Sequence, residues 1–375
     1  TDPETGETKN TMRFEPTRNS YRPLPDSIKV VIIDESSMVS VELFQQLVLA
    51  LPHNPQFIFI GDIQQLPPVF GSAILGFKML EHKTIELIQV YRQALESPII
   101  KYATDIKDGK TFVTTEKICE ETPRGKLTIH PWKKKLSPDV AMLTFCKFIT
   151  TAYDHGAYNP DNDCILIPFN KAFGTIEVNK HIAQHIARKQ GRVVWEVIAG
   201  FNKLYFSVGD KVLYDKEDAE IVSISPNKTY LGKKPQKESV TLDYWGHNPN
   251  ITESSSLADP TMEEVDLMLE QMAAFTGDAN EDRVRAASHI ITIRMVDSDK
   301  ELIVDTASDL NSLILSYTLT VHKAQGSEWD KVFLILHQSH NTMIQRELLY
   351  TAITRAAKEL YVICEPDCFE KGVLS

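Results

Sequence analysis

Several short apolar runs in this chain are followed by side chains whose types suit the chemistry of nucleotide phosphates. Asp34 and Glu35 directly follow the run Val30–Ile33. A carboxylate pair at the carboxyl end of a buried parallel strand can hold hydrated Mg²⁺ and polarise an attacking water. A lone acid pair more often starts a turn or caps a helix, so further residues must decide between these interpretations.

Two more blocks follow the same pattern of an apolar run and then polar residues. Gly61 follows the run 57–60 and permits close backbone approach, and Gln65 can hydrogen-bond a phosphate or a water. Arg92 follows the stretch 86–90, and its planar guanidinium suits phosphate oxygens. Together with the acid pair, these blocks favour a phosphate-transfer site.

Two further blocks lie near the end of the chain: Tyr-Thr-Leu-Thr-Val-His-Lys-Ala-Gln-Gly-Ser-Glu at 317–328 and Leu-Leu-Tyr-Thr-Ala-Ile-Thr-Arg-Ala at 348–356. The five blocks, in this order, resemble motifs II to VI of superfamily 1 helicases. The forms GDxxQLPPV, VHKAQGSE and YTAITRA are similar to the RecD/Dda-like branch, superfamily 1B. The resemblance covers about residues 28–364 and implies two RecA-like domains, with ATP between them and single-stranded DNA across their tops, translocating 5′ to 3′.

The resemblance implies a role for each residue of the ATP site. Asp34 would be the Mg²⁺-associated carboxylate and Glu35 the catalytic base. Gln65 and Arg92 would sense the γ-phosphate, and Arg355 would be the arginine finger from the second domain. The cofactors implied are therefore ATP and Mg²⁺.

Two parts of the later motifs bear on nucleotide binding. On a helix expected over 348–356, Arg355 lies on a different face from the apolar residues, so we expect it to project away from the core. The alternative is an ordinary solvated surface arginine. Glu328 resembles the nucleotide-contacting glutamate of the family, and Gly326 belongs to the same motif.

Other residues match the family's DNA contacts. Thr320, His322 and Lys323 lie where motif V meets DNA and couples it to the ATP site. Asn170 and Lys171, after an apolar run, resemble a DNA-phosphate contact of the second domain. The alternative for His322 is an ordinary polar residue at the surface. The alternative for Asn170 and Lys171 is an ordinary loop between a strand and a helix.

Residues 1–27 fall where Dda-like helicases carry a hairpin that separates duplex strands. Phe14, on an expected short strand, could stack on the last base pair. A mobile chain end is the alternative interpretation. The run Trp132–Lys135 combines an aromatic ring with three cations and is a further candidate for contact with single strands.

The family's motif I, the phosphate loop GxxxxGK[ST], is missing from this sequence. Gly109-Lys110-Thr111 is the only Gly-Lys-Thr, but Thr104 stands where the loop needs its first glycine. We expect this tripeptide to be the loop after a helix over 99–106. Since motif I precedes motif II in the family, we expect the chain to be a piece of a longer polypeptide, with little ATPase activity alone.

The apolar runs are separated by helical segments, which predicts an α/β fold with buried parallel sheets. With the resemblance, we expect two RecA-like domains of the P-loop NTPase type. The predicted divisions are a hairpin region at 1–27, a first domain at 28–140, a second domain at 141–200 and 311–375, and a β-rich, SH3-like insertion at 201–310. The insertion contains an acidic helical segment at 259–282, a candidate site for a replication or recombination partner.

Composition excludes several classes of protein. With 375 residues, 42% hydrophobic and 24% charged, the chain is an ordinary globular protein. Its net charge of −11 disfavours coating of nucleic acid through bulk charge, although a local basic groove remains open. Five cysteines without a CxxC pair disfavour a disulfide framework, so we expect a cytoplasmic protein. No apolar run approaches the length of a membrane span, so we expect no contact with membranes.

Two other functions remain open at this point. One is a non-catalytic subunit that binds DNA and protein, with ATPase motifs that no longer act; the joint presence of Glu35, Gln65, Arg92 and Arg355 argues against it. The other is an RNA helicase of the same superfamily. The hypothesis we favour is an ATP-dependent DNA helicase acting on single-stranded and fork DNA.

Overall fold

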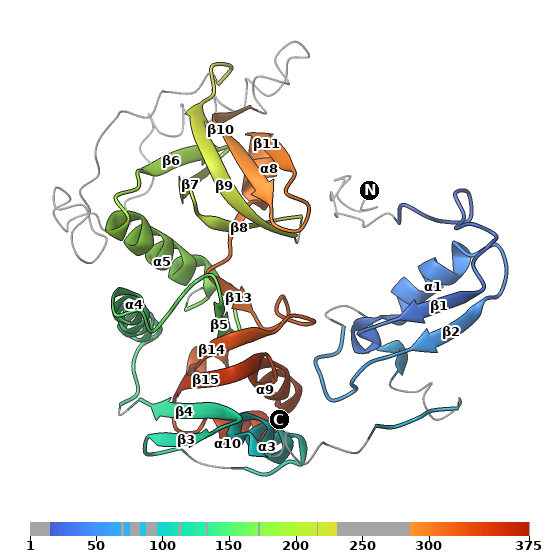
Figure 1. Ribbon diagram of the computed structural model, residues 1–375, viewed down its shortest axis with the longest axis horizontal. Coiled ribbons are helices and arrows are strands. Elements are labelled where there is room, and N and C mark those ends of the chain that lie inside the picture. The colour runs from blue at the N-terminus through green and yellow to red at the C-terminus, as the bar shows by residue number, and fades with distance from the viewer. Residues whose placement is uncertain are drawn as a thin grey trace, which may run out of the picture.

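The computed structural model describes residues 16–68, 71–75, 83–87, 96–111, 114–132, 134–171, 173–215, 217–230 and 286–374 (Figure 1). Phe14, Arg92 and the acidic segment 259–282 therefore lie outside the described residues.

The first unit is a two-stranded parallel sheet with a helix on one face. Strands β1 (Val30–Ile33) and β2 (Gln56–Phe59) pair in register, and α1 (Val41–Leu49) connects them. Phe44 of α1 packs on Phe57 and Phe59, with ring centroids 5.2 and 5.5 Å apart. On the other face, Ile32 is 62% exposed and Ile60 52% exposed. The two predicted apolar runs are confirmed as strands. Among the described residues, no element packs on the face of the sheet opposite α1.

The larger unit contains a six-stranded sheet in the order β13-β5-β14-β15-β4-β3. All neighbouring strands are parallel except β3, which runs antiparallel to β4. The strands are β3 (Ile118–Thr122), β4 (Gly125–Pro131), β5 (Asp163–Ile167), β13 (Thr318–Thr320), β14 (Trp329–Leu336) and β15 (Ala356–Cys364).

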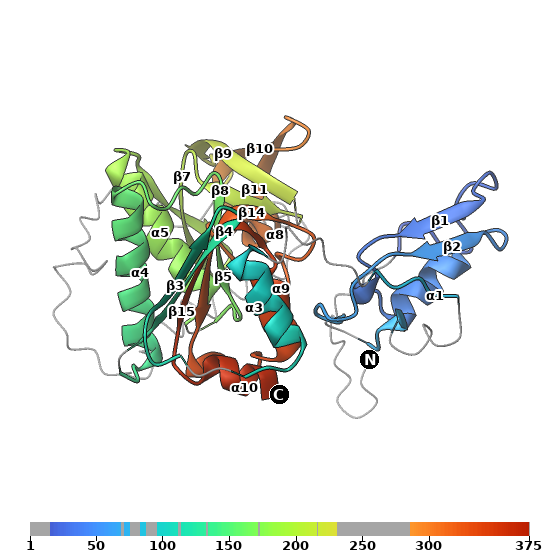
Figure 2. The same ribbon diagram turned by 60° about the horizontal axis from the view of Figure 1, so that its bottom comes forward.

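Helices cover both faces of this sheet (Figure 2). Helices α3 (Pro98–Lys107), α9 (Arg346–Ile353) and α10 (Cys368–Leu374) pack on one face, and α4 (Pro138–Asp154) and α5 (Thr175–Lys189) on the other. Alternate residues of β5 serve the two cores: Cys164 and Leu166 face the first group of helices, Ile165 and Ile167 the second. Because both faces are buried, the strands can be apolar at every position.

The predicted boundary of the first domain at residue 140 is wrong. Strand β4 pairs in parallel with β15, and β3 completes the edge of the same sheet. Helix α3 contributes Ile99, Ala103 and Ile106 to the core that α9 also fills. Helix α3 and strands β3 and β4 therefore belong to the six-stranded unit, because apolar side chains of α3 and β4 are buried in its core.

The β-rich insertion is confirmed, although it begins earlier than residue 201. A hairpin of β6 (Val194–Ala199) and β7 (Asn202–Ser207) packs on a five-stranded antiparallel sheet in the order β11-β10-β9-β8-β12. The sheet strands are β8 (Lys211–Tyr214), β9 (Glu217–Pro226), β10 (Ala286–Met295), β11 (Glu301–Thr306) and β12 (Ile314–Leu315), with α8 (Ala307–Ser312) between the last two. Its SH3-like character stays a prediction.

The loop character of Gly109-Lys110-Thr111 is confirmed. Gly109 has φ 76° and follows the end of α3, and the Lys110 ammonium pairs with Asp105 of that helix at 2.6 Å. Within the part of the chain that the structure describes, no helix has both the length and the apolar character needed to cross a bilayer.

Candidate functional site

The acid pair lies in a sharp turn at the carboxyl end of β1. The Asp34 carboxylate accepts the backbone N–H of Glu35 at 2.8 Å, and Glu35 has φ 48° and ψ 37°, a left-handed conformation that is costly for this residue type. Ser36 then donates from both its N–H and its hydroxyl to the Ile60 carbonyl, at 2.9 and 2.7 Å. These bonds leave Asp34 exposed and tie the acid pair to the end of β2.

The loop after β2 lies directly against this turn. A Cβ on Gly61 would stand 2.8 Å from the Ser36 hydroxyl oxygen and 3.0 Å from its nitrogen, so only glycine fits. Asp62 accepts the N–H of Gln64 at 2.9 Å, which tightens the loop. The amide oxygen of Gln65 is buried and has no hydrogen-bond partner among the described residues. A buried oxygen of this kind is an available acceptor for a water or ligand donor.

The same loop is bonded to the six-stranded unit. The N–H of Leu66 donates to the Thr351 hydroxyl at 3.1 Å, and the Leu66 carbonyl accepts from the Gln325 amide at 3.2 Å. The Tyr350 hydroxyl donates to Asp62 at 2.9 Å, and burial together with that carboxylate raises the pKa of Tyr350 to about 12. Leu66 itself is only 1% exposed, in the core that α9 fills. Motifs III, V and VI therefore meet at one loop.

The prediction that Arg355 projects away from the core is wrong. Its side chain is 8% exposed, with Nε donating to the Thr351 carbonyl at 3.1 Å and Nη1 donating to the Ser327 carbonyl at 3.1 Å. Helix α9 ends at Ile353, so Arg355 lies in the tight connection to β15 and not on a helical face. Two carbonyls thus hold the guanidinium between α9 and the turn after β13.

The predicted motif V residues lie together in that turn. Thr320 ends β13, and its hydroxyl accepts the N–H of Lys323 at 3.3 Å. Gly326 has φ 76°, and Glu328 is exposed. Burial lowers the pKa of His322; the Lys323 side chain reaches the surface, but neighbouring protein partly desolvates its ammonium and also lowers its pKa. Both side chains are therefore partly desolvated, and the lowered pKa of His322 favours its neutral form.

The loop after β5 lies at the same edge of the sheet as this turn, because β5 and β13 are parallel neighbours with Thr320 opposite Ile167. Asn170 and Lys171 are exposed in this loop. A Cβ on Gly174 would lie 2.4 Å from the Asn170 carbonyl carbon, so glycine is required for the close return into α5. The structure thus brings the two predicted DNA-contact groups to one edge.

The remaining predicted residues are not part of this group in the structure. Phe14 and Arg92 lie outside the described residues. Trp132 is half-buried and stacks on Phe173 with ring centroids 6.1 Å apart, so packing accounts for much of its surface. Sequence reasoning gave no role to Tyr21, which is 93% exposed in a turn closed by an antiparallel bridge between Asn19 and Arg22.

The contacts made by Asp62, Gln325, Tyr350 and Thr351 were also missed. These residues stand inside the motif blocks, so their positions signalled a function, but their partners lie more than 250 residues away in the chain.

Comparison with known proteins shows what the chain is similar to. The model of the UvrD-like helicase C-terminal domain matches residues 315–363, and an AAA domain model matches residues 4–128. The ATP-dependent RecD2 DNA helicase of Deinococcus radiodurans is 27% identical over 349 residues, covering 92% of this chain and 37% of the relative. The RecBCD enzyme subunit RecD of Mycobacterium tuberculosis is 36% identical over 354 residues, covering 89% of this chain and 49% of the relative. The chain is a homologue of the RecD-type superfamily 1 helicases.

This RecD-type chain spans between about a third and half of the length of these two relatives. Among solved structures, the Pif1 helicase from Bacteroides in complex with ADP-AlF3 and single-stranded DNA aligns with a TM-score of 0.43 and 15% identity, covering 93% of this chain and 76% of that one.

Proposed function

We propose that the RecD-type chain carries motifs II to VI of an ATP-dependent DNA helicase that moves 5′ to 3′ on single-stranded DNA. The observation that supports this most directly is the position of the loop 61–66. It lies against the acid pair through Gly61, and it is hydrogen-bonded to Gln325, Tyr350 and Thr351. One loop therefore touches the proposed ATP site and both motifs of the second domain, which suits transmission between ATP hydrolysis and DNA movement.

The residues at the end of β1 fit Mg²⁺ and ATP. Asp34 is exposed and uses one oxygen for the Glu35 N–H, so the carboxylate can also reach water of a hydrated Mg²⁺. The bound nucleotide would supply the phosphoanhydride whose hydrolysis drives the cycle. The unpartnered amide oxygen of Gln65 could accept a hydrogen bond from the attacking water, and Glu35 is the proposed base.

Cationic groups would complete the ATP site. We assign Arg355 as the arginine finger, with Arg92 as a further phosphate contact and Glu328 and Gly326 at the nucleotide. In the described conformation Arg355 is bonded to the Thr351 and Ser327 carbonyls, so it must leave them to reach a phosphate. This arrangement favours a cycle in which the arginine is released as the two domains close.

The DNA path would follow the carboxyl edge of the six-stranded sheet. Asn170, Lys171, His322 and Lys323 present polar groups there, as backbone contact with single strands requires. Thr320, the remaining candidate contact, is buried in the described conformation and bonded to the Lys323 N–H. We further propose that residues 1–27 separate duplex strands. Phe14 and the exposed Tyr21 are the stacking candidates.

One face of the β1–β2 sheet is exposed among the described residues. This supports the proposal that further parts of the first domain cover it. Parallel sheets are normally covered on both sides, yet Ile32 and Ile60 are exposed. We propose that a phosphate-loop strand and its helix complete this domain in the full polypeptide, and that residues 1–375 alone hydrolyse ATP poorly.

The biological setting stands as a proposal too. We propose that the protein acts in replication, recombination or repair in the cytoplasm of a bacterial or phage-infected cell. The acidic segment 259–282 is the proposed contact for a protein partner.

Forked substrates test the proposed function in the complete polypeptide. We expect unwinding of a DNA duplex that bears a 5′ single-stranded tail, with no unwinding of a matched 3′-tailed duplex. A requirement for a 3′ tail would overturn the polarity, and stimulation by RNA in place of DNA would favour the RNA helicase. Tight DNA binding without any ATP-dependent unwinding would favour a non-catalytic subunit.

A further inference from the structure

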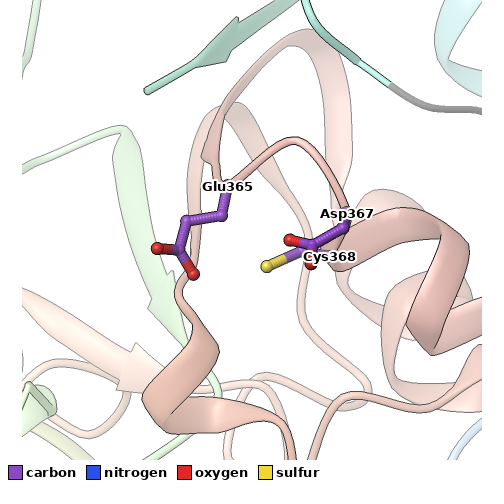
Figure 3. A group of neighbouring side chains, drawn as sticks. All are labelled: Glu365, Asp367 and Cys368. Carbon is purple, nitrogen blue, oxygen red and sulfur yellow. The ribbon is translucent and has the colours of Figure 1, made fainter. Parts of the chain in front are cut away.

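Three side chains of ligand type converge where β15 passes into α10, at some remove in sequence from every helicase motif. Glu365 directly follows β15, Cys368 is the first residue of α10, and Asp367 lies between them. One ligand atom from each residue lies within 4.8 Å of the other two. Figure 3 shows the Cys368 sulfur pointing toward the Glu365 carboxylate, with the Asp367 carboxylate beside it.

The Glu365 carboxylate is buried and only half satisfied. Its side chain is 1% exposed, and one oxygen accepts the N–H of Gln338 at 2.6 Å. The other oxygen has no hydrogen-bond partner among the described residues. The ring of His337 stands 3.8 Å away, but its nearer nitrogen is bonded to the Leu136 carbonyl at 3.0 Å. An unpartnered oxygen on a buried carboxylate is costly, and a cation removes that cost.

The charges of the group match a divalent cation. Asp367 pairs with Lys371 at 2.7 Å, which lowers the pKa of Asp367. The Cys368 sulfur lies beside both carboxylates, and the residue is only 1% exposed. When the thiol ionises, three negative charges face one lysine. A cation of charge +2 then makes the group neutral.

We propose that Glu365, Asp367 and Cys368 bind a divalent metal ion of borderline softness, for which Zn²⁺ is the best match. One thiolate and two carboxylate oxygens are ligands that zinc accepts, whereas Mg²⁺ and Ca²⁺ prefer oxygen alone. In a tetrahedral site the ligand atoms stand about 3.5 Å apart, so the three side chains need to close by about 1 Å. On binding, the Cys368 S–H bond breaks, its proton passes to solvent and a sulfur–metal bond forms.

The ion would have a structural role: it would cross-link elements at the carboxyl edge of the sheet. Glu365 is bonded to the backbone after β14 through Gln338, and Cys368 begins α10, which packs in the core with α9. Bound metal would therefore join β14, β15 and α10, and we expect it to raise the thermal stability of this unit.

Cadmium titration of the metal-free chain tests the site directly, because a cadmium–thiolate bond has its own ultraviolet charge-transfer absorption. We expect one Cd²⁺ per chain, displaced by Zn²⁺, and an unfolding temperature raised by either ion. Because binding releases the Cys368 proton, the apparent affinity should rise with pH.

Variants at two buried cysteines separate the site from other thiols. Cys368→Ser should weaken binding by about 100-fold or more and abolish the thiolate absorption, and Glu365→Gln should weaken binding while the absorption persists at saturation. Cys146→Ser, at a buried cysteine of α4, is the matched control and should bind like the wild type. A wild-type chain without a saturable thiolate signal, or a signal that survives Cys368→Ser, overturns the proposal whether or not any variant folds.

Discussion

The hydroxyl of Tyr350 donates a 2.9 Å hydrogen bond to the carboxylate of Asp62, across 288 positions in the sequence. Asp62 stands in the loop beside the acid pair, and Tyr350 lies on α9, five residues before Arg355. The bond therefore joins the proposed water-activating loop to the helix that leads into the proposed arginine finger. A hydrogen bond to a charged acceptor contributes about 1.5–3 kcal/mol.

Tyr350→Phe should weaken communication between the two domains. We expect the ATP turnover of the complete polypeptide to fall about tenfold on saturating single-stranded DNA, because Asp62 loses its partner on α9. Affinity for DNA should stay unchanged, since Tyr350 is not among the proposed DNA contacts. Steady-state ATPase assays with varied DNA concentration measure both quantities.

Tyr361→Phe is the matched control for that variant. It removes a hydroxyl that donates to the Glu359 carboxylate at 3.0 Å within β15, so the same type of bond is lost inside one domain. Equal losses of turnover in the two variants would show that the Tyr350 bond has no special role.

Thr351→Val should loosen the loop that contains Leu66. The valine keeps the shape of this fully buried side chain but removes the acceptor for the Leu66 N–H. A buried donor without a partner costs about 1–3 kcal/mol, so hydrogen exchange of the Leu66 amide should accelerate about tenfold or more. Thr351→Ser retains the acceptor and should restore protection. Unchanged exchange in the valine variant would mean that this bond does not hold the loop.

Arg355→Ala should lower turnover by about 10³-fold or more in the complete polypeptide if the guanidinium stabilises the transition state. Binding of single-stranded DNA should survive. Because the side chain also bonds the Thr351 and Ser327 carbonyls, some loss of thermal stability is expected as well. Arg346→Ala, at the partly exposed start of α9, controls for loss of charge on the same helix. Parallel losses of DNA affinity and turnover would identify Arg355 as a structural or DNA-binding residue.

The junction between the insertion and the six-stranded unit should respond to pH through Asp210. Burial raises the pKa of this carboxyl from 3.8 to about 6, against opposing contributions from the Ser207 N–H, Arg192 and Tyr317. The folded state thus binds the proton more tightly than the unfolded state, so the free energy of unfolding should fall as pH rises from about 4 to about 6. Two pKa units correspond to about 3 kcal/mol.

Urea unfolding at both ends of that pH range measures this effect. Asp210→Asn should lack this part of the pH dependence, whereas Asp161→Asn, at an exposed ion pair in the same region, should keep it. Identical pH profiles for the wild type and Asp210→Asn would contradict the assignment.

The strands and the helicase motifs were predictable because their signals are local. A run that is apolar at every position, such as Val30–Ile33, indicates a strand, and the structure has a strand there, although one face of it is exposed among the described residues. The sheet that a strand joins is not local information. Residues 118–131 follow the first domain in sequence, yet β4 pairs with β15 more than 200 residues later.

The environment of Arg355 was unpredictable for the same reason. Helical periodicity places a residue on a face only while the helix lasts, and α9 ends at Ile353. The Ser327 carbonyl, which accepts a hydrogen bond from the buried Arg355 guanidinium, belongs to another motif. The sequence therefore predicted candidate functional residues but not which of them contact one another.

Glu35→Gln in the complete polypeptide tests the central claim most directly. This change keeps the size of the proposed base and removes its charge, while Glu116→Gln removes an exposed carboxylate of the six-stranded unit as a control. The measurement is ATP hydrolysis stimulated by single-stranded DNA, together with nucleotide affinity from a fluorescent ATP analogue. The account predicts that Glu35→Gln binds nucleotide like the wild type and loses turnover by about 10²-fold or more. Full turnover in Glu35→Gln, or lost nucleotide binding with residual turnover preserved, would contradict it.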